Sequence, residues 1–324
     1  MKHVVIDEGS SQIKVAWFDN GIQEKIIPSR LVEGLRLNQD GSFHDGAYTV
    51  NQNDYTVAAN FDSPIRTNTQ QYQTSEYNRV LVHEALRKCG FGGQDVCVYC
   101  TLPISDFFGV KPRNDALIAE KKKNLMAPVT NMSGHELAKI VQCVVWPEAI
   151  PAWLDLLIDD KGESALSVDE SYKIMIVDIG GTTTDKTIID GNGALQEFES
   201  FRRGVFDVAE NLSAILIKST GRKKIEPHQI DNALRIQKFA ESEIKEEIQT
   251  ACRPVIRDIH LEMVKFARES SNLDAVVYVG GGASIMAKSI ATLYKGNTII
   301  GDEMSISRGI LKKLISNKTI EVAQ

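Results

Sequence analysis

The sequence contains an internal repeat, and this repeat constrains the fold more than any other feature. Residues 4–21 and 175–193 each begin with an apolar run that ends in an aspartate, Asp7 or Asp178, and then pass through a turn of Gly, Ser and Thr. In both copies a second apolar run follows, and an Asp at its far turn lies 12 residues after the first Asp. Two successive turns in one register predict strand–turn–strand twice over. We therefore expect two related domains.

The segments after each copy extend the same pattern. A third alternating run closes each repeat, at residues 22–27 and 195–201. Apolar periodicity further along predicts a series of helices and strands. The helices are expected at 76–89, 114–125, 147–158, 205–216, 228–268 and 305–315, and the strands at 96–100, 141–146 and 275–279. The polar residues 159–171 are the best candidate for a linker between domains.

Charge and composition exclude several classes of protein. The 324 residues carry 37 Lys and Arg against 43 Asp and Glu, a net charge of −6, so bulk attraction to nucleic acid is a poor expectation. The apolar runs are too short for a membrane span, and Asp7 interrupts any signal-peptide core. We therefore expect a cytoplasmic protein. Five cysteines, an odd number, argue against a disulfide framework and favour buried thiols.

The two Gly-rich turns suit an anion. Residues 8–12 (EGSSQ) and 179–184 (IGGTTT) let backbone N–H groups approach a phosphate, and two symmetric loops can hold a polyphosphate from both sides. Lys14 follows the first turn and can reach a terminal phosphate as a point charge, or it is simply an exposed strand lysine.

The repeated aspartates predict a metal. Asp7 and Asp178 would lie near each other beside the phosphates, and paired carboxylates repel unless a cation lies between them. Oxygen ligands and retained waters favour Mg²⁺. Asp185 follows Asp178 by seven residues, as Lys14 follows Asp7. It either contacts metal-bound water or caps the hairpin.

Two further segments have both a structural and a functional interpretation. Glu148 follows Pro147 after a strand, which is typical of a helix start, but a carboxylate there can also orient or deprotonate an attacking water. Spacing alone favours the helix start. Residues 280–283 (GGGA) follow a buried strand, so a base or ribose can pack on bare backbone, or the glycines form a strand–helix turn.

Other nucleotide signatures are absent, but the order of these motifs resembles the actin/sugar-kinase/heat-shock-70 superfamily. The sequence has no P-loop, no G-x-G-x-x-G fingerprint and no kinase motif set. The matching segments are DEGSSQIK (7–14), WPEAI (146–150), DIGGTTTD (178–185), VGGGAS (279–284) and SRGI (307–310). Residues 67–86, 100–108 (CTLPISDFF) and 119–124 (AEKKKN) further resemble the plasmid-segregation actins of the ParM (StbA) family.

The resemblance implies an α/β, actin-like fold of two duplicated RNase H-like domains that flank a nucleotide cleft. Domain I would comprise residues 1–165 plus 305–324, and domain II residues 166–304. Glu148 and Asp178 would be catalytic, and Asp7 and Asp178 would contact Mg²⁺ through water. The resemblance assigns phosphate binding to Gly9, Ser10, Ser11, Lys14, Gly180, Gly181, Thr182 and Thr183, with Asp7 beside them, and adenosine binding to Gly280, Gly281, Gly282 and Ala283. Glu8 departs from the family pattern, and strand alternation predicts that it points away from the phosphates.

The function implied by the resemblance is a polymerising ATPase for plasmid DNA segregation, with ATP/ADP (or GTP) and Mg²⁺ as ligands. Its partners would be other copies of the chain, in a filament, and a centromere-bound DNA-binding adaptor, with no direct contact to nucleic acid or membrane. One alternative is a small-molecule kinase on the same fold, although no acceptor motif is evident. Another is an actin-like scaffold of cell shape or division.

Overall fold

The computed structural model describes residues 1–58, 65, 67, 69, 71–109, 113–269, 273–290, 292–294 and 296–320. Positions 68 and 70 of the ParM-like run and positions 321–324 of the expected first domain lie outside the described residues. The chain divides into two compact units. Unit 1 comprises Met1–Leu166 and Ile306–Gln324, and unit 2 comprises Ser167–Ser305.

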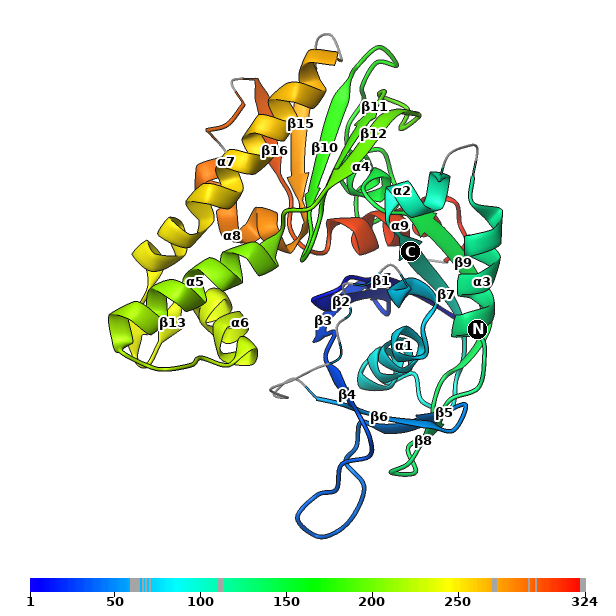
Figure 1. Ribbon diagram of the computed structural model, residues 1–324. Coiled ribbons are helices and arrows are strands. Elements are labelled where there is room, and N and C mark those ends of the chain that lie inside the picture. Colours follow the sequence, from blue (N-terminus) through cyan, green and yellow to red (C-terminus); the bar gives the residue numbers. More distant parts are fainter. Residues whose placement is uncertain are drawn as a thin grey trace. The chain divides into compact units, whose positions relative to one another are not determined.

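Unit 1 is built on a five-stranded sheet (Figure 1). Its strands are β1 (Lys2–Glu8), β2 (Gln12–Phe18), β3 (Ile22–Pro28), β7 (Asp95–Leu102) and β9 (Lys139–Pro147). The spatial order is β3-β2-β1-β7-β9, with β1, β2 and β3 antiparallel and β7 and β9 parallel to β1. The first repeat thus forms a meander, and the later strands add to its open edge through crossover connections.

Helices and a small sheet complete unit 1. The helices are η1 (Tyr72–Thr74), α1 (Glu76–Lys88), α2 (Ile104–Phe108), α3 (Asp115–Leu125), α4 (Ile150–Leu157) and α9 (Ser305–Ser316). The small sheet has the order β4-β6-β5-β8, from β4 (Leu31–Glu33), β5 (Ala47–Val50), β6 (Asn53–Val57) and β8 (Thr130–Asn131). The Ser75 hydroxyl accepts from the Asn78 N–H and so caps the start of α1.

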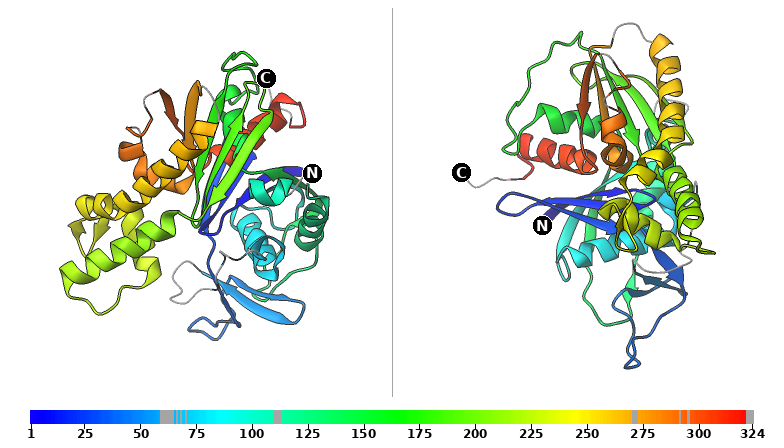
Figure 2. Two further views of the ribbon diagram at one scale, coloured as in Figure 1. Left: turned by 45° about the horizontal axis from the view of Figure 1, so that its top comes forward. Right: turned by 90° about the vertical axis from the view of Figure 1, so that its left-hand side faces the viewer.

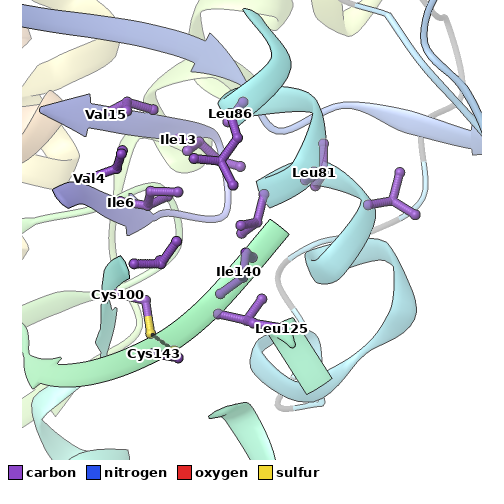
Figure 3. Packing of buried hydrophobic residues seen from close by; sticks show 14 of the residues in the cluster. Val4, Ile6, Ile13, Val15, Leu81, Leu86, Cys100, Leu125, Ile140 and Cys143 are labelled. Carbon is purple, nitrogen blue, oxygen red and sulfur yellow. Dashed lines mark hydrogen bonds between the residues drawn. The ribbon is translucent and has the colours of Figure 1, made fainter. Parts of the chain in front are cut away.

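The core of unit 1 shows which face of the sheet carries the chemistry. Val4 and Ile6 of β1 belong to the apolar cluster that contains Leu81 and Leu86 of α1 (Figure 3). Because side chains alternate along a strand, Asp7 points to the other face. The meander therefore packs one face under α1, and Asp7 lies on the opposite face together with the buried Val5 and Ala16.

Unit 2 repeats this sheet. Its strands are β10 (Ile174–Ile179), β11 (Thr184–Ile189), β12 (Leu195–Phe201), β15 (Ala275–Val279) and β16 (Asn297–Ile300). Their order is β12-β11-β10-β15-β16, again with an antiparallel meander and two parallel strands beside the first one. The expected duplication is confirmed.

The helices of unit 2 differ in one place from the expectation. They are α5 (Val205–Thr220), α6 (Pro227–Ile236), α7 (Lys245–Glu269) and α8 (Gly280–Ile290), and α5 and α7 pack along one another (Figure 2). The single helical region expected at 228–268 is wrong, because a hairpin of β13 (Lys238–Phe239) and β14 (Ser242–Glu243) separates α6 from α7. The cause lies in the backbone: Gln237 ends α6 with φ of 54°, and Ala240 and Glu241 turn the hairpin at positive φ.

Two expectations from composition can be compared with the structure. Among the described residues, the structure contains no helix that combines the length and apolarity needed to span a membrane. All five cysteines are unpaired thiols, four of them buried, which bears out the expected buried thiols. Cys100 and Cys143 lie on neighbouring strands with their sulfur atoms 3.5 Å apart (Figure 3).

Candidate functional site

The first Gly-rich loop of unit 1, residues 9–11, is held by its carbonyl oxygens. The Ser29 hydroxyl donates to the Gly9 carbonyl at 2.8 Å, the Thr67 hydroxyl donates to the Ser10 carbonyl, and the Ser29 N–H donates to the Ser11 carbonyl at 3.0 Å. In a trans peptide the N–H points opposite to the preceding C=O. The N–H groups of Ser10 and Ser11 are therefore directed away from Ser29 and Thr67. Such a row of backbone donors is what an anion site requires.

The second loop, residues 180–183 of unit 2, is held in the same sense by a helix. The first N–H groups of α5 donate to it, from Val205 to the Gly180 carbonyl at 3.0 Å and from Phe206 to the Gly181 carbonyl at 2.8 Å. A Cβ at Gly204 would lie 2.5–2.6 Å from these two carbonyl oxygens, so only glycine allows the approach. The peptide N–H groups of Gly181 and Thr182 point away from α5.

In unit 1 the carboxylate of Asp7 already has a cationic partner. Asp7 pairs with Lys14 in the register of β1 and β2, and the Lys14 ammonium lies 2.9 Å from Asp7 Oδ2. Thr101 of β7 donates its hydroxyl to Asp7 Oδ1 at 2.9 Å, and the Thr101 hydroxyl oxygen also lies 3.3 Å from Glu148 Oε1. Strand ends thus bring Asp7, Lys14, Thr101 and Glu148 together. Lys14 is partly buried and bonded to Asp7, so its interpretation as a merely exposed strand lysine is wrong.

Glu148 does not begin a helix. Pro147 is the last residue of β9, and α4 begins at Ile150 after Ala149. Ala149 has φ of 67° and ψ of −60°, and the Ile150 N–H donates to the Glu148 carbonyl at 2.9 Å, which together define a γ-turn. The helix-start interpretation of Pro147 and Glu148 is therefore wrong, because the parallel pairing of β9 with β7 extends through Pro147.

In unit 2 two carboxylates face each other. Asp178 and Asp185 are directly opposite in the pairing of β10 and β11, both are buried, and an oxygen of one lies within 4.8 Å of an oxygen of the other. The Ser200 hydroxyl donates to Asp185. The hairpin cap is Asp190 instead, whose Oδ1 accepts from the N–H groups of Asn192 and Ala194. Two buried like charges with oxygen donors are a chemical fit for Mg²⁺.

The three glycines at the start of α8 differ in what a side chain at each position would contact. A Cβ at Gly280 would lie 2.3 Å from Asp178 Oδ1, and one at Gly282 would lie 2.2 Å from the Ile179 side chain. These two glycines let α8 pack on the end of β10. At Gly281 the nearest atom to a Cβ is Glu303 Oε2 at 3.8 Å, an ordinary contact, so of the three glycines Gly281 alone leaves room for a Cβ. The structural explanation therefore holds for two of the three glycines.

A cavity of about 290 Å³ lies in unit 2. Its walls come from α7, α8 and the residue before β13, and include Gln237, Lys245, Gln249, Cys252, Ser284 and Ile285. Gln249 and Cys252 lie on the α7 wall of this cavity. Their spacing along α7 follows the same 3–4-residue period as its apolar core positions, so periodicity could not separate cavity from core.

Glu8 lies on the opposite face of β1 from Asp7, as strand alternation predicts. It is fully buried, 3.1 Å from the Lys121 ammonium, and accepts the Thr101 N–H at 3.0 Å. Burial raises the pKa of the Glu8 carboxyl. For Lys121, burial acts to lower the pKa, but the negative charge of Glu8 outweighs it and the pKa of Lys121 is raised. Lys121 belongs to the expected polar helix, but the structure buries it, which the run of three lysines did not indicate.

Comparison with known proteins adds the family. Residues 1–159 match the family model described as Plasmid segregation protein ParM, N-terminal, and residues 176–292 match Archaeal actin homologue MreB-like, C-terminal. The chain belongs to the actin-like ATPase superfamily. Within it, the N-terminal match places this actin-like protein close to ParM, which confirms the resemblance seen in the sequence. No curated protein matches the chain.

Solved structures show the same fold along nearly the whole actin-like chain. Ta0583, an archaeal actin homologue in complex with ADP, is 18% identical, covers 99% of this chain and 100% of its own, and gives a TM-score of 0.72. The 15-stranded ParM filament from Clostridium botulinum is 17% identical, with coverage of 98% and 99% and a TM-score of 0.72. Bacillus thuringiensis ParM with AMPPNP is 14% identical, with coverage of 96% and 97% and a TM-score of 0.69. At these identities the likeness establishes the actin-like α/β fold.

Proposed function

We propose that this actin-like protein is a nucleotide-dependent polymerising ATPase whose filaments segregate plasmid DNA. The observation that carries the proposal is the pair of loops, 9–11 and 180–183. Each is tied back through its carbonyl oxygens, so that its N–H groups form an anion cradle. The match to the N-terminal family model of ParM supports the cellular role.

In this proposal a nucleoside triphosphate is the substrate. Its phosphates lie against Gly9, Ser10 and Ser11 of the first loop and against residues 180–183 of the second. Its sugar and base pack on Gly281 and enter the cavity between α7 and α8, whose mixed polar and apolar walls suit a purine. Solved relatives of the same fold hold ADP or AMPPNP, which supports ATP as the nucleotide, with GTP as the alternative.

Hydrolysis follows from the carboxylates. Mg²⁺, when bound, supplies positive charge beside the terminal phosphates. Asp178 and Asp185 would hold Mg²⁺ directly or through its waters, and Asp7 would contribute through water. Lys14 exchanges its bond to Asp7 for the terminal phosphate. Glu148 accepts a proton from the attacking water as the water oxygen bonds to the γ-phosphorus. The bond from the γ-phosphorus to the β–γ bridging oxygen breaks, and the products are the nucleoside diphosphate and phosphate.

Polymerisation would use nucleotide as the switch. A bound triphosphate favours one conformation, and a head-to-tail contact between identical chains then extends into an open helical filament. Hydrolysis weakens that contact and releases subunits. A centromere-bound adaptor would join the filament to DNA, in keeping with a net charge of −6.

Sedimentation and electron microscopy test the proposal directly. The purified chain is incubated with Mg·ATP, Mg·GTP, Mg·ADP, Mg·ATP plus excess chelator, or no nucleotide, and phosphate release is followed in parallel. We expect filaments that pellet with Mg·triphosphate only, and phosphate release without any acceptor substrate. A chain that stays in the supernatant with every nucleotide would overturn the filament role. Phosphate transfer that requires a small-molecule acceptor would favour the kinase alternative.

A further inference from the structure

Thr101 lies where three carboxylates converge, and no role assigned so far includes it. It is fully buried near the end of β7. Its hydroxyl oxygen lies 2.9 Å from Asp7 Oδ1 and 3.3 Å from Glu148 Oε1, and its N–H donates to Glu8. A threonine at this position therefore connects the expected hydrolytic carboxylate to the strand that carries the first phosphate loop.

The chemistry of the hydroxyl makes it an adjustable donor. A hydroxyl has one proton, and two ionised carboxylates can only accept, so Thr101 donates to one of them at a time or shares its proton between them. The second oxygen of Asp7 is held by Lys14 at 2.9 Å. Rotation of the Thr101 proton alone shifts its hydrogen bond toward Glu148, without movement of a heavy atom.

The backbone of Glu148 is fixed independently. Its N–H donates to the Leu102 carbonyl at 2.8 Å, and its carbonyl accepts from Ile150 across the γ-turn at Ala149. That turn places a non-glycine residue at φ of 67°, an unfavourable conformation that persists only where the surroundings enforce it. Strain of this kind next to a charged side chain is typical of functional sites.

Helix α9 supplies part of that enforcement. A Cβ at Gly309 would lie 1.8 Å from the Pro151 carbonyl oxygen, so glycine lets α9 cross the first turn of α4 in contact. Arg308 then binds both oxygens of Asp155 on α4, at 2.8 and 2.7 Å. The helix that follows Glu148 is thereby clamped.

We propose that Thr101 is a positioning residue for Glu148: its hydroxyl orients the Glu148 carboxylate toward the attacking water, while the strained turn at Ala149 fixes the backbone beneath it. The inference rests on the proposed hydrolysis. It predicts that Thr101 affects the rate of the chemical step and not the affinity for nucleotide, because its hydroxyl contacts the carboxylates and lies buried beneath them.

Two substitutions of Thr101 and one control substitution test the proposal. Thr101→Val keeps the shape and removes the hydroxyl, and we expect kcat for phosphate release to fall about tenfold with KM within about twofold of wild type, since a hydrogen bond to a charged group is lost. Thr101→Ser restores the hydroxyl and should restore kcat. Thr56→Val is the matched control, because Thr56 is an equally buried threonine whose hydroxyl bonds Gly34 in the small sheet. It should leave kcat unchanged.

A double variant separates positioning from stability. If Thr101 acts through Glu148, then Thr101→Val lowers kcat no further in a Glu148→Gln background, whereas a general structural effect would lower it again. Nucleotide binding and the urea midpoint show whether each variant is folded. Should Thr101→Val fail to fold, Thr101→Ser and Ala149→Gly carry the test. Glycine relaxes the strain at Ala149, so we expect a kcat about threefold lower with no loss of stability.

The outcomes distinguish this inference from the proposed function. Absence of phosphate release from the wild-type chain overturns the hydrolysis role, and this inference with it. Normal release from wild type combined with an unchanged kcat in Thr101→Val overturns the inference alone. The inference alone is also overturned if Thr101→Val lowers kcat equally in the Glu148→Gln background. A kcat of Ala149→Gly equal to that of wild type overturns it as well.

Discussion

The first hairpins of the two units have the same strand pairing but differ in the charge of the residue opposite the first aspartate. In each, an aspartate at the end of the first strand lies directly across from a residue seven positions later. In unit 1 that residue is Lys14, and the pair is neutral. In unit 2 it is Asp185, so two buried carboxylates face each other. The repeat thus preserves the pairing of the hairpin and changes the charge of the residue opposite the first aspartate.

The two Gly-rich loops differ in how they are anchored. Loop 9–11 is anchored by side-chain hydroxyls and one N–H from Ser29 and Thr67, while loop 180–183 is anchored by the first turn of α5. The cores differ as well. Unit 1 buries the ion pair of Glu8 and Lys121. Unit 2 buries Lys186 instead, with its ammonium over the rings of Phe201 and Phe266. Equivalent positions should therefore respond differently to the same substitution.

The largest expected effect separates the hydrolytic role of unit 1 from the metal role of unit 2. We expect Glu148→Gln to lower kcat for phosphate release by about 100-fold or more while leaving Mg·nucleotide binding intact, because only the proton acceptor is lost. Filaments should then persist longer in electron micrographs. Glu120→Gln, on an exposed position of α3, is the matched control.

Asp178→Ala should instead abolish the response to Mg²⁺. Phosphate release titrated with Mg²⁺ measures this, and turnover by Asp178→Ala that still rises with Mg²⁺ would contradict the division of roles between the units. Turnover of Glu148→Gln at the wild-type rate would contradict the proposed hydrolytic role of Glu148 in unit 1.

The next effect compares the two loop anchors. Gly204→Ala forces a methyl group against the carbonyls of the second loop and should destabilise unit 2 by about 2–4 kcal/mol, with loss of nucleotide affinity. Ser29→Ala removes one hydroxyl and keeps the Ser29 N–H bond, so we expect a cost of about 1 kcal/mol. Urea unfolding and binding of a fluorescent ATP analogue measure both.

Gly281→Ala is the control for a glycine substitution, because its Cβ would meet no atom closer than 3.8 Å. Its stability without nucleotide should equal that of wild type. Equal stability losses in Gly204→Ala and Ser29→Ala would show that the two anchors do not differ as the contacts indicate.

A third effect concerns pH and the polar core of unit 1. Burial lowers the pKa of His83 to about 4, against 6.5 in the unfolded chain. The unfolded state therefore binds an extra proton between these values, so the stability of unit 1 falls as pH drops from 6.5 to 4, by about 3 kcal/mol at most. Above pH 6.5 the protonation of His83 no longer changes the stability of unit 1.

Fluorescence can isolate this effect, since Trp17, Trp146 and Trp153 are the three tryptophans and all belong to unit 1. We expect the pH slope of the urea midpoint to flatten in His83→Phe and to remain in His260→Gln of unit 2. The slopes are compared, so a uniform loss of stability in His83→Phe does not obscure the result. An identical slope in His83→Phe would assign the acid sensitivity to other groups.

The smallest effect has opposite signs in the two units. Without nucleotide and Mg²⁺, Asp7→Asn should destabilise the chain by about 1 kcal/mol, because it weakens the bonds to Lys14 and Thr101. Asp185→Asn should stabilise it by about 0.5–1 kcal/mol, because it removes a like charge directly opposite Asp178. Calorimetry measures both, and a fall in stability for Asp185→Asn would show that repulsion from Asp178 is not the dominant interaction of Asp185. With Mg·ATP present, the gain in stability of Asp185→Asn over wild type should disappear.

The sequence was sufficient for the parts of this protein that are local or repeated. Period-two alternation and two turns in register predicted both meanders. The structure then shows that the residue seven positions after each aspartate is its partner across the hairpin. The same logic placed Glu8 on the opposite face from Asp7. These predictions succeed because strand alternation and turn chemistry act over a few neighbouring residues.

Only the tertiary structure decided how those residues are used. Thr101, Gly204 and Ser29 gain their importance from partners 18 or more positions away, or from a close approach that a Cβ would block, and no local pattern encodes either. The same holds for the strained turn that presents Glu148, because its sequence reads as an ordinary helix start until the pairing of β9 extends through Pro147. Local sequence determines which groups are available, whereas long-range packing determines which of them meet.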